Sequence, residues 1–281
     1  MKKCIITQCM FCDHSRFQEV FEYKQPPIGE TDFGLLKSDL YYRKIISCMI
    51  CGHFYSTGHM DLSTLYSSEY NTSTYKNADG MYNALQRIIH LDPEKSDNIG
   101  RCNRIEEFLR HRNVAKQRDS YKILDVGSGL GIFPYVMSKR GYQVTALDPD
   151  PQAVRHIEDY VNVPTLCGNF FEVTPLEDYD LIVFNKVLEH VENPIAMLHR
   201  AVSFLKKDGL FYVELPDGET AKNIGAEREE FSIDHLHVFS FVSISLLAAR
   251  VGLSALEIER LQEPSTKFTL RAFFGNSSDI K

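Results

Sequence analysis

Four cysteines in two Cys-x-x-Cys pairs have a spacing that is typical of metal binding. Cys9 and Cys12 form one pair, and Cys48 and Cys51, followed by Gly52, form the other. Two such pairs can supply four thiolates to a tetrahedral Zn²⁺, and a β-hairpin can bridge the long gap between them. Four bound thiolates leave no open position, so the zinc would be structural. The alternative is four buried or redox-active thiols.

A glycine-rich run provides the second cluster. Residues 123–131 read Ile-Leu-Asp-Val-Gly-Ser-Gly-Leu-Gly, which predicts a strand, a tight turn and the start of a helix. Asp148, at the end of the next apolar run, can accept both hydroxyls of a ribose. The spacing Gly-x-Gly-x-Gly differs from the dinucleotide fingerprint and argues against a nicotinamide-dependent reductase. The alternative is that the glycines only turn the chain and the aspartates only cap helices.

Histidines and one glutamate supply the candidate general bases, because imidazole titrates near neutrality. They are Glu189 and His190, which follow an apolar run, and His235 and His237, which lie in a His-rich loop. Ser240 can cap the helix after this loop. The alternative for any one histidine is a bond to a backbone carbonyl and no catalytic role.

Alternating strands and helices must position these residues. The expected strands cover residues 122–126, 143–148, 165–168, 181–185, 210–215, 255–260 and 268–274, and the expected helices cover 131–140, 153–160, 194–206 and 241–250. This alternation predicts a mostly parallel sheet covered on both faces. A short polar loop joins the last two strands, which are expected to form an antiparallel hairpin at the edge. Residues 61–120 show helical periodicity that breaks at Asp92-Pro93.

Two of these segments resemble motifs of class I S-adenosylmethionine-dependent methyltransferases. Residues 124–131 resemble the first motif, and residues 179–191, with their Leu-Glu-His-Val ending, resemble the motif of the fourth strand. The resemblance covers about residues 122–275 and implies an α/β, Rossmann-like seven-stranded sheet that binds S-adenosylmethionine. The implied cofactor-binding residues are Asp125, Gly127, Ser128, Gly129, Gly131, Asp148, Pro149, Asn169, Phe170 and Asn185. Tyrosines before the core often close over the cofactor in this family, which adds Tyr70 and Tyr75; core packing is the alternative for these two.

The chain of 281 residues is expected to divide into three parts. These are a small zinc-ribbon-like module (1–60), a helical linker or cap (61–120) and the Rossmann-like methyltransferase domain (121–281). A four-cysteine module ahead of this domain resembles deoxysugar methyltransferases. That favours methyl transfer to a hydroxyl or carbon of a sugar, nucleotide-sugar or polysaccharide-related small molecule. The alternatives are a protein or RNA acceptor, or an inactive binding or scaffold subunit.

Charge and hydropathy indicate which classes of partner and which cellular location to expect for the protein. The net charge of −7 argues against nucleic acid as the main partner. No apolar run follows the two lysines at the start, as a signal peptide requires, and residues 239–251 are too short to cross a bilayer. A cytoplasmic protein with a small-molecule, carbohydrate-linked substrate is therefore expected.

Overall fold

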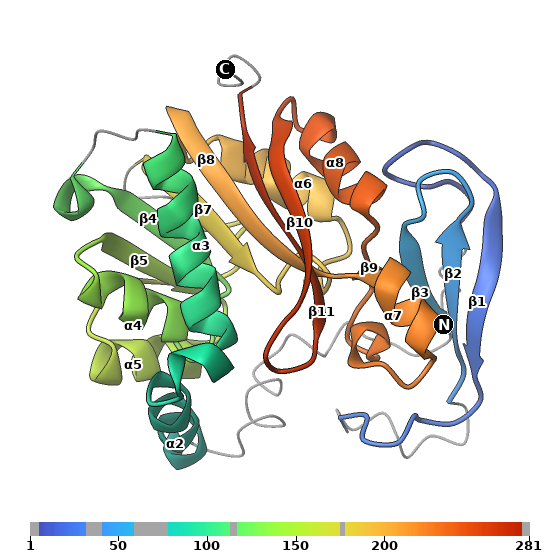
Figure 1. Cartoon of the computed structure of the whole chain (residues 1–281), viewed down its shortest axis with the longest axis horizontal. Coiled ribbons are helices and arrows are strands. Elements are labelled where there is room, and N and C mark those ends of the chain that lie inside the picture. The colour runs from blue at the N-terminus through green and yellow to red at the C-terminus, as the bar shows by residue number, and fades with distance from the viewer. Residues whose placement is uncertain (1–5, 32–40, 59–77, 113–116, 175–177, 277–281) are drawn as a thin grey trace.

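A seven-stranded sheet forms the centre of the protein (Figure 1). The computed structural model describes residues 6–31, 41–58, 78–112, 117–174 and 178–276. The strand order is β10-β11-β8-β7-β4-β5-β6, with β10 and β11 antiparallel to their neighbours and the other five strands parallel. The bounds are β4 (Lys122–Val126), β5 (Gln143–Asp148), β6 (Thr165–Cys167), β7 (Tyr179–Asn185), β8 (Leu205–Pro216), β10 (Ser254–Gln262) and β11 (Phe268–Gly275).

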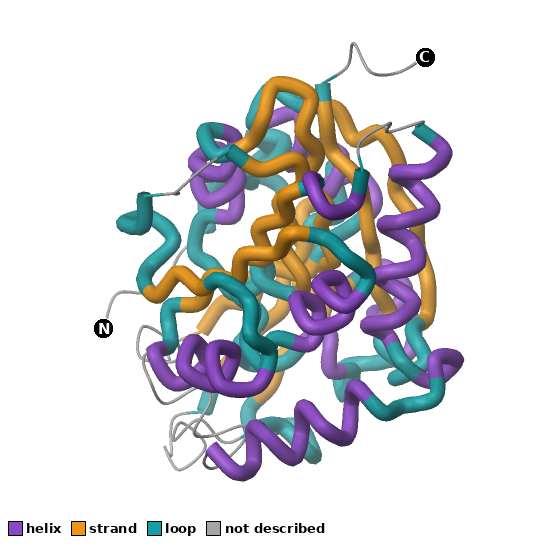
Figure 2. Tube along the Cα trace, turned by 90° about the vertical axis from the view of Figure 1, so that its left-hand side faces the viewer, coloured by secondary structure: helices purple, strands orange, loops and turns teal. Residues whose placement is uncertain are grey.

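Helices cover both faces of this sheet, because its central strands carry apolar side chains on both sides. On one face α3 (Asp97–His111) and α4 (Ile132–Lys139) pack against Ile123, Leu181 and Tyr212. α2 (Ala78–Ile89) and α5 (Pro151–Tyr160) extend this layer. On the other face α6 (Pro194–Val202) and α8 (Phe241–Arg250) pack against Leu124 and Ile182. Figure 2 shows helices on both sides of the strands.

A smaller antiparallel sheet lies beside the large one. It consists of β1 (Phe17–Tyr23), β2 (Arg43–Cys48), β3 (Phe54–Gly58) and β9 (His237–Val238), in that order. The last strand comes from the segment between α7 (Gly218–Ile224) and α8, so a C-terminal segment completes an N-terminal sheet. The core under this sheet also combines the two parts, with Ile45 and Phe54 packed among Phe231 and Val238.

The strand predictions are confirmed, including the antiparallel hairpin at the edge. The helix expected over 194–206 was too long. It ends at Val202 because the chain turns through Phe204, whose carbonyl accepts from Tyr179 N–H, and pairs with β7 from Leu205 onward. The break between α2 and α3 is confirmed: Asp92 caps a 3₁₀ turn at Pro93–Lys95. The division at residues 60 and 120 stays a prediction. Within the described ranges, no helix has the length and apolarity to span a bilayer.

Candidate functional site

The glycine turn joins the carboxyl end of β4 to α4 at the centre of the sheet. Gly127, Gly129 and Gly131 have φ angles of 73°, 52° and 70°, in the left-handed region. A Cβ on Gly127 would lie 2.7 Å from Val187 Cγ2 in the loop after β7, whereas a Cβ on Gly129 would meet no described atom within 4 Å. The turn therefore packs tightly on one side and leaves room beside Gly129 on the other.

The carboxylate of Asp148 ends β5 and faces this turn. Its Oδ2 accepts from Gly129 N–H at 2.8 Å, and its Oδ1 accepts from Asp150 N–H at 2.9 Å. Burial raises the pKa of Asp148. Each oxygen keeps a further lone pair, so the carboxylate can still accept hydrogen bonds from two hydroxyl groups.

Asp125 and Asn185 meet at the carboxyl ends of β4 and β7. Asn185 Nδ2 donates to Asp125 Oδ1 at 3.2 Å, and the Ser128 hydroxyl donates to the Asp125 main-chain oxygen at 2.9 Å. Burial raises the pKa of Asp125 to about 7. Asp125, Asp148, Asn185 and the glycine turn thus lie at the carboxyl ends of neighbouring parallel strands, the edge at which open α/β sheets generally bind ligands.

The remaining expected cofactor contacts lie farther along this edge. Pro149 and Asn169 are exposed, and Asn169 Oδ1 accepts from Phe171 N–H at 3.0 Å. Phe170 is buried and packs against other core rings, those of Phe184 and Phe204. The exposed ring at this turn is that of Phe171, which was not among the residues expected from the motif. Tyr70 and Tyr75 lie outside the described residues.

Three of the four candidate bases come together. Glu189 and His190 follow β7, and His235 precedes β9. One carboxylate oxygen of Glu189 and one ring nitrogen of each histidine lie within 4.8 Å of one another. The His190 and His235 ring centroids are 4.9 Å apart. Burial lowers the pKa of His235, which favours its neutral ring. Glu189 and His190 belong to the loop after β7, whose Val187 packs against Gly127 of the glycine turn.

His237 occupies a different environment. It is buried, its Nδ1 lies 3.0 Å from His53 Nε2, and its Nε2 lies 3.3 Å from the carbonyl oxygen of Glu192. His53 in turn bonds Ser243 at 3.2 Å. Burial lowers the pKa of His237 to about 4 and that of His53 well below its usual value. These contacts link the residue before β3 to β9 and α8. Of this region the sequence indicated only the helix cap at Ser240, which the structure contains.

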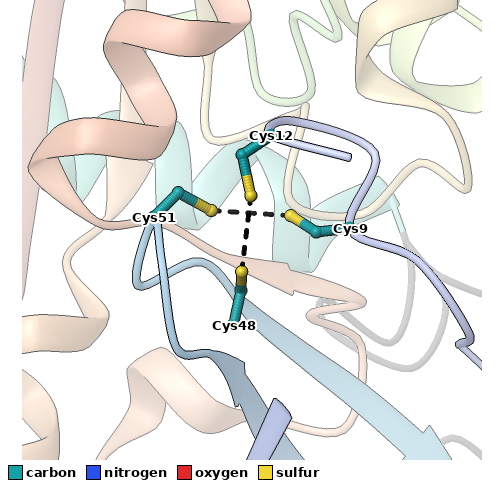
Figure 3. Close-up of side chains that lie close together, drawn as sticks. All are labelled: Cys9, Cys12, Cys48 and Cys51. Atoms are coloured by element: carbon teal, nitrogen blue, oxygen red, sulfur yellow. Dashed lines mark hydrogen bonds between the residues drawn. The ribbon is translucent and has the colours of Figure 1, made fainter. Parts of the chain in front are cut away.

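The four cysteines converge at the end of the small sheet, and Figure 3 shows their side chains pointing toward one another. Cys9 Sγ and Cys51 Sγ are 3.5 Å apart, as are Cys12 Sγ and Cys48 Sγ. The hydrogen bond between Cys9 and Cys51 lowers the pKa of Cys9 to about 4 and raises that of Cys51. Four sulfurs at one point are the donor set that Zn²⁺ prefers, so the residues fit the metal.

A buried ion pair beside the site was missed. Arg101 of α3 donates to Glu214 of β8 at 2.5 Å, and the Tyr212 hydroxyl donates to the same carboxylate at 2.5 Å. Glu214 stands opposite Asn185 in the pairing of β7 with β8. The signal in the sequence was a glutamate inside the apolar run Phe-Tyr-Val-Glu-Leu, since a charge buried in a strand needs a partner.

Comparison with known proteins yields a family match and several relatives. The model described as "Methyltransferase domain" matches residues 101–258, more than half of the chain. The ubiquinone biosynthesis O-methyltransferase of Rickettsia typhi is 30% identical over 139 residues, which are 48% of this chain and 52% of that protein. The chain spans about half the length of the curated relatives it matches.

Solved structures share the fold. Magnesium protoporphyrin IX methyltransferase from Synechocystis PCC 6803, with bound S-adenosylhomocysteine, gives a TM-score of 0.55 at 15% identity and covers 77% of this chain and 100% of that one. The 1,6-didemethyltoxoflavin-N1-methyltransferase of Burkholderia thailandensis gives 0.54 at 14% identity and covers 83% of this chain and 95% of that one. The predicted α/β methyltransferase fold is thereby confirmed.

Proposed function

Because this chain belongs to the methyltransferase domain family, we propose that it transfers a methyl group from S-adenosylmethionine to a hydroxyl oxygen of a small molecule. One observation carries the proposal. The Asp148 carboxylate is fixed by Gly129 N–H at 2.8 Å, at the carboxyl end of β5, in a turn where a Cβ on Gly129 would meet no described atom within 4 Å. This arrangement suits a ligand with a ribose diol.

The residues of this edge have separable tasks. Asp148 would bind the ribose hydroxyls, and the main chain at Gly127–Gly131 would lie along the rest of the cofactor. Asn169, Pro149 and the exposed ring of Phe171 would border its base. Asp125, held by Asn185, would lie beneath the cofactor. S-adenosylmethionine, when bound, supplies the methyl group on a sulfonium that already carries its leaving group, so the protein's main task is to align the acceptor.

A hydroxyl acceptor also has to lose a proton. We favour the Glu189, His190 and His235 cluster for this step because Glu189 and His190 belong to the loop that contacts the glycine turn. The two ring nitrogens of His237 instead face His53 and the Glu192 carbonyl. We assign the activation of the acceptor hydroxyl to this cluster and a structural role to His237.

The names of the relatives bear on the acceptor. Those named for ubiquinone biosynthesis are O-methyltransferases, which supports oxygen as the methylated atom and a ubiquinone precursor as the first acceptor to test. They give no support to the sugar acceptor expected from the cysteine module. A nucleotide-sugar remains the second acceptor to test, on the strength of that module alone.

The cysteine cluster is proposed to hold structural zinc. Both knuckles contact α8: the Ser240 hydroxyl donates to the Cys51 carbonyl at 2.5 Å, and Arg250 Nε donates to the Phe11 carbonyl at 2.9 Å. A filled metal site would fix both ends of α8 relative to the small sheet. Its four thiolates leave no position for a substrate.

Calorimetric titration with S-adenosylhomocysteine tests the cofactor site. Each hydrogen bond to a charged group contributes about 1.5–3 kcal/mol, so Asp148→Ala is expected to weaken binding by at least about tenfold. Asp150→Asn, which keeps an oxygen to cap α5, is the matched control and should bind like wild type. Absence of binding to folded wild-type protein would overturn the proposal and favour the scaffold alternative. Release of S-adenosylhomocysteine with each acceptor then identifies the substrate.

A further inference from the structure

Glu189 has a buried carboxyl group whose oxygens lack a hydrogen-bond donor among the described residues. Its side chain is 0% exposed. Neither of its oxygens accepts a hydrogen bond from any part of the chain that the structure describes. Buried carboxylates are normally paired, hydrogen-bonded or coordinated to a metal, because an isolated buried charge is costly. Within the described ranges, His190 Nε2 lies 4.0 Å from Glu189 Oε1.

Two histidines are oriented toward this carboxylate by backbone carbonyls. His190 Nδ1 lies 3.0 Å from the Asp234 carbonyl, and His235 Nδ1 lies 2.9 Å from the Glu230 carbonyl. A carbonyl oxygen only accepts, so each Nδ1 carries the hydrogen, and the lone pair of a neutral ring is on Nε2. A carbonyl on one ring nitrogen is the usual way in which proteins orient a histidine that binds metal through the other.

We propose that Glu189, His190 and His235 form a second metal site, which binds a divalent first-row transition-metal ion such as Zn²⁺, Fe²⁺ or Co²⁺. Two imidazoles and one carboxylate suit these ions better than Mg²⁺. The ligating atoms lie within 4.8 Å of one another. A metal bonded at about 2.1 Å can bridge atoms up to about 4.2 Å apart, so a small closure suffices.

The site differs from the cysteine cluster in what it can do. Three protein ligands leave a coordination position open, as in catalytic rather than structural metal sites. A catalytic role for this metal rests on the proposed function: the oxygen of the methyl acceptor takes the open coordination position. The metal lowers its pKa and its O–H proton passes to water. The oxygen then bonds the methyl carbon as the carbon–sulfur bond breaks, and S-adenosylhomocysteine leaves.

A competing reading needs no metal: His190 alone acts as the base, with Glu189 as its counter-ion. That reading gives His235 no ligand role and predicts no metal affinity at the cluster. Direct measurement of metal binding therefore separates the two readings, whatever the enzyme's activity.

Titration with Co²⁺ tests the site in full-length protein whose cysteine cluster already contains one equivalent of zinc. The proposal predicts one further equivalent by calorimetry, with weak visible d–d bands and no intense thiolate charge-transfer band. Glu189→Gln and His235→Gln should each weaken this binding at least tenfold. Glu192→Gln and His199→Gln make the same changes at exposed positions close by and should leave it unchanged.

Three results would overturn the proposal: no second equivalent in wild type, unchanged binding in both cluster variants, or only the thiolate band that signals exchange at the cysteines. S-adenosylhomocysteine titrations of the same proteins keep the two proposals apart, because its affinity should persist in Glu189→Gln. Cobalt binding without S-adenosylhomocysteine binding would leave the metal site standing and remove the proposed function. The reverse pattern would do the opposite. Thermal unfolding of each variant checks that it is folded.

Discussion

Alanine at Gly127 is expected to destabilise the protein more than alanine at Gly129, although both glycines lie in the same turn. Both have positive φ angles, 73° and 52°. Only at Gly127 would the new Cβ collide with the protein, at 2.7 Å from Val187 Cγ2. The two variants therefore share the backbone strain and differ in the steric overlap.

The expected magnitudes follow from these two contributions. A left-handed backbone costs a non-glycine residue about 1–2 kcal/mol. Overpacking a fitted contact costs about 1–3 kcal/mol more. Gly129→Ala should thus lower the free energy of unfolding by about 1–2 kcal/mol and Gly127→Ala by about 2–5 kcal/mol. Gly129→Ala should instead weaken S-adenosylhomocysteine binding, because its Cβ would enter the space beside the turn.

Urea-induced unfolding of the two variants and of wild type measures the difference. Adding Val187→Ala to Gly127→Ala should recover about 1–3 kcal/mol, the part due to overlap, while leaving the backbone strain. If both glycine variants unfold at the same urea concentration, or if Val187→Ala only adds its own cost, the contact between the glycine turn and the loop after β7 does not explain the need for glycine.

Three further predictions concern the metal and two buried ionisable groups. Removal of zinc, by chelation or by Cys48→Ser, should lower the melting temperature by at least about 10 °C, because zinc binding drives the folding of small modules. A loss of 1 kcal/mol lowers the melting temperature of a chain of this size by about 2–4 °C. An unchanged melting temperature would mean that the cluster carries no structural metal. Burial lowers the pKa of His237 from 6.5 to about 4, so the unfolded state binds more protons between these values and the protein loses stability as pH falls through that window. In His237→Gln this acid-side slope of the unfolding free energy should be smaller, and an identical slope would contradict the shift. Burial raises the pKa of Asp125 from 3.8 to about 7, so the sign is opposite: stability declines as pH rises from 4 to 7, and Asp125→Asn should remove that decline in unfolding experiments at fixed ionic strength.

The sequence predicted the central sheet well because its signals are local. Strands β4 and β5 were predicted to the residue, since each is an apolar run that stops at a glycine or an acidic residue. The helix α8 was also predicted to the residue, from the cap at Ser240. The end of α6 was missed because residues 203–206 continue a helical pattern that pairing with β7 overrides.

Contacts between distant segments were not accessible in this way. The strand β9 has two residues, too few for any periodicity, and forms only because β3 offers it an edge. His190 and His235 were separate candidates, and nothing in their spacing indicated that their rings would lie side by side. The partner of Glu214 was likewise hidden on α3. Such pairings depend on the tertiary fold, which propensity and pattern do not encode.

During biosynthesis β9 is made long after β3, the strand with which it pairs. His53, next to β3, and its neighbour His237, in β9, are 184 residues apart in the chain. At roughly 5–20 residues per second, the ribosome needs on the order of 10–40 s to make the distance between them. During that time β3 presents an unpaired edge and Phe54 has no cover from Val238, a state prone to aggregation. Zinc captured as soon as Cys51 leaves the ribosome would hold the nascent hairpin closed until its last strand is made.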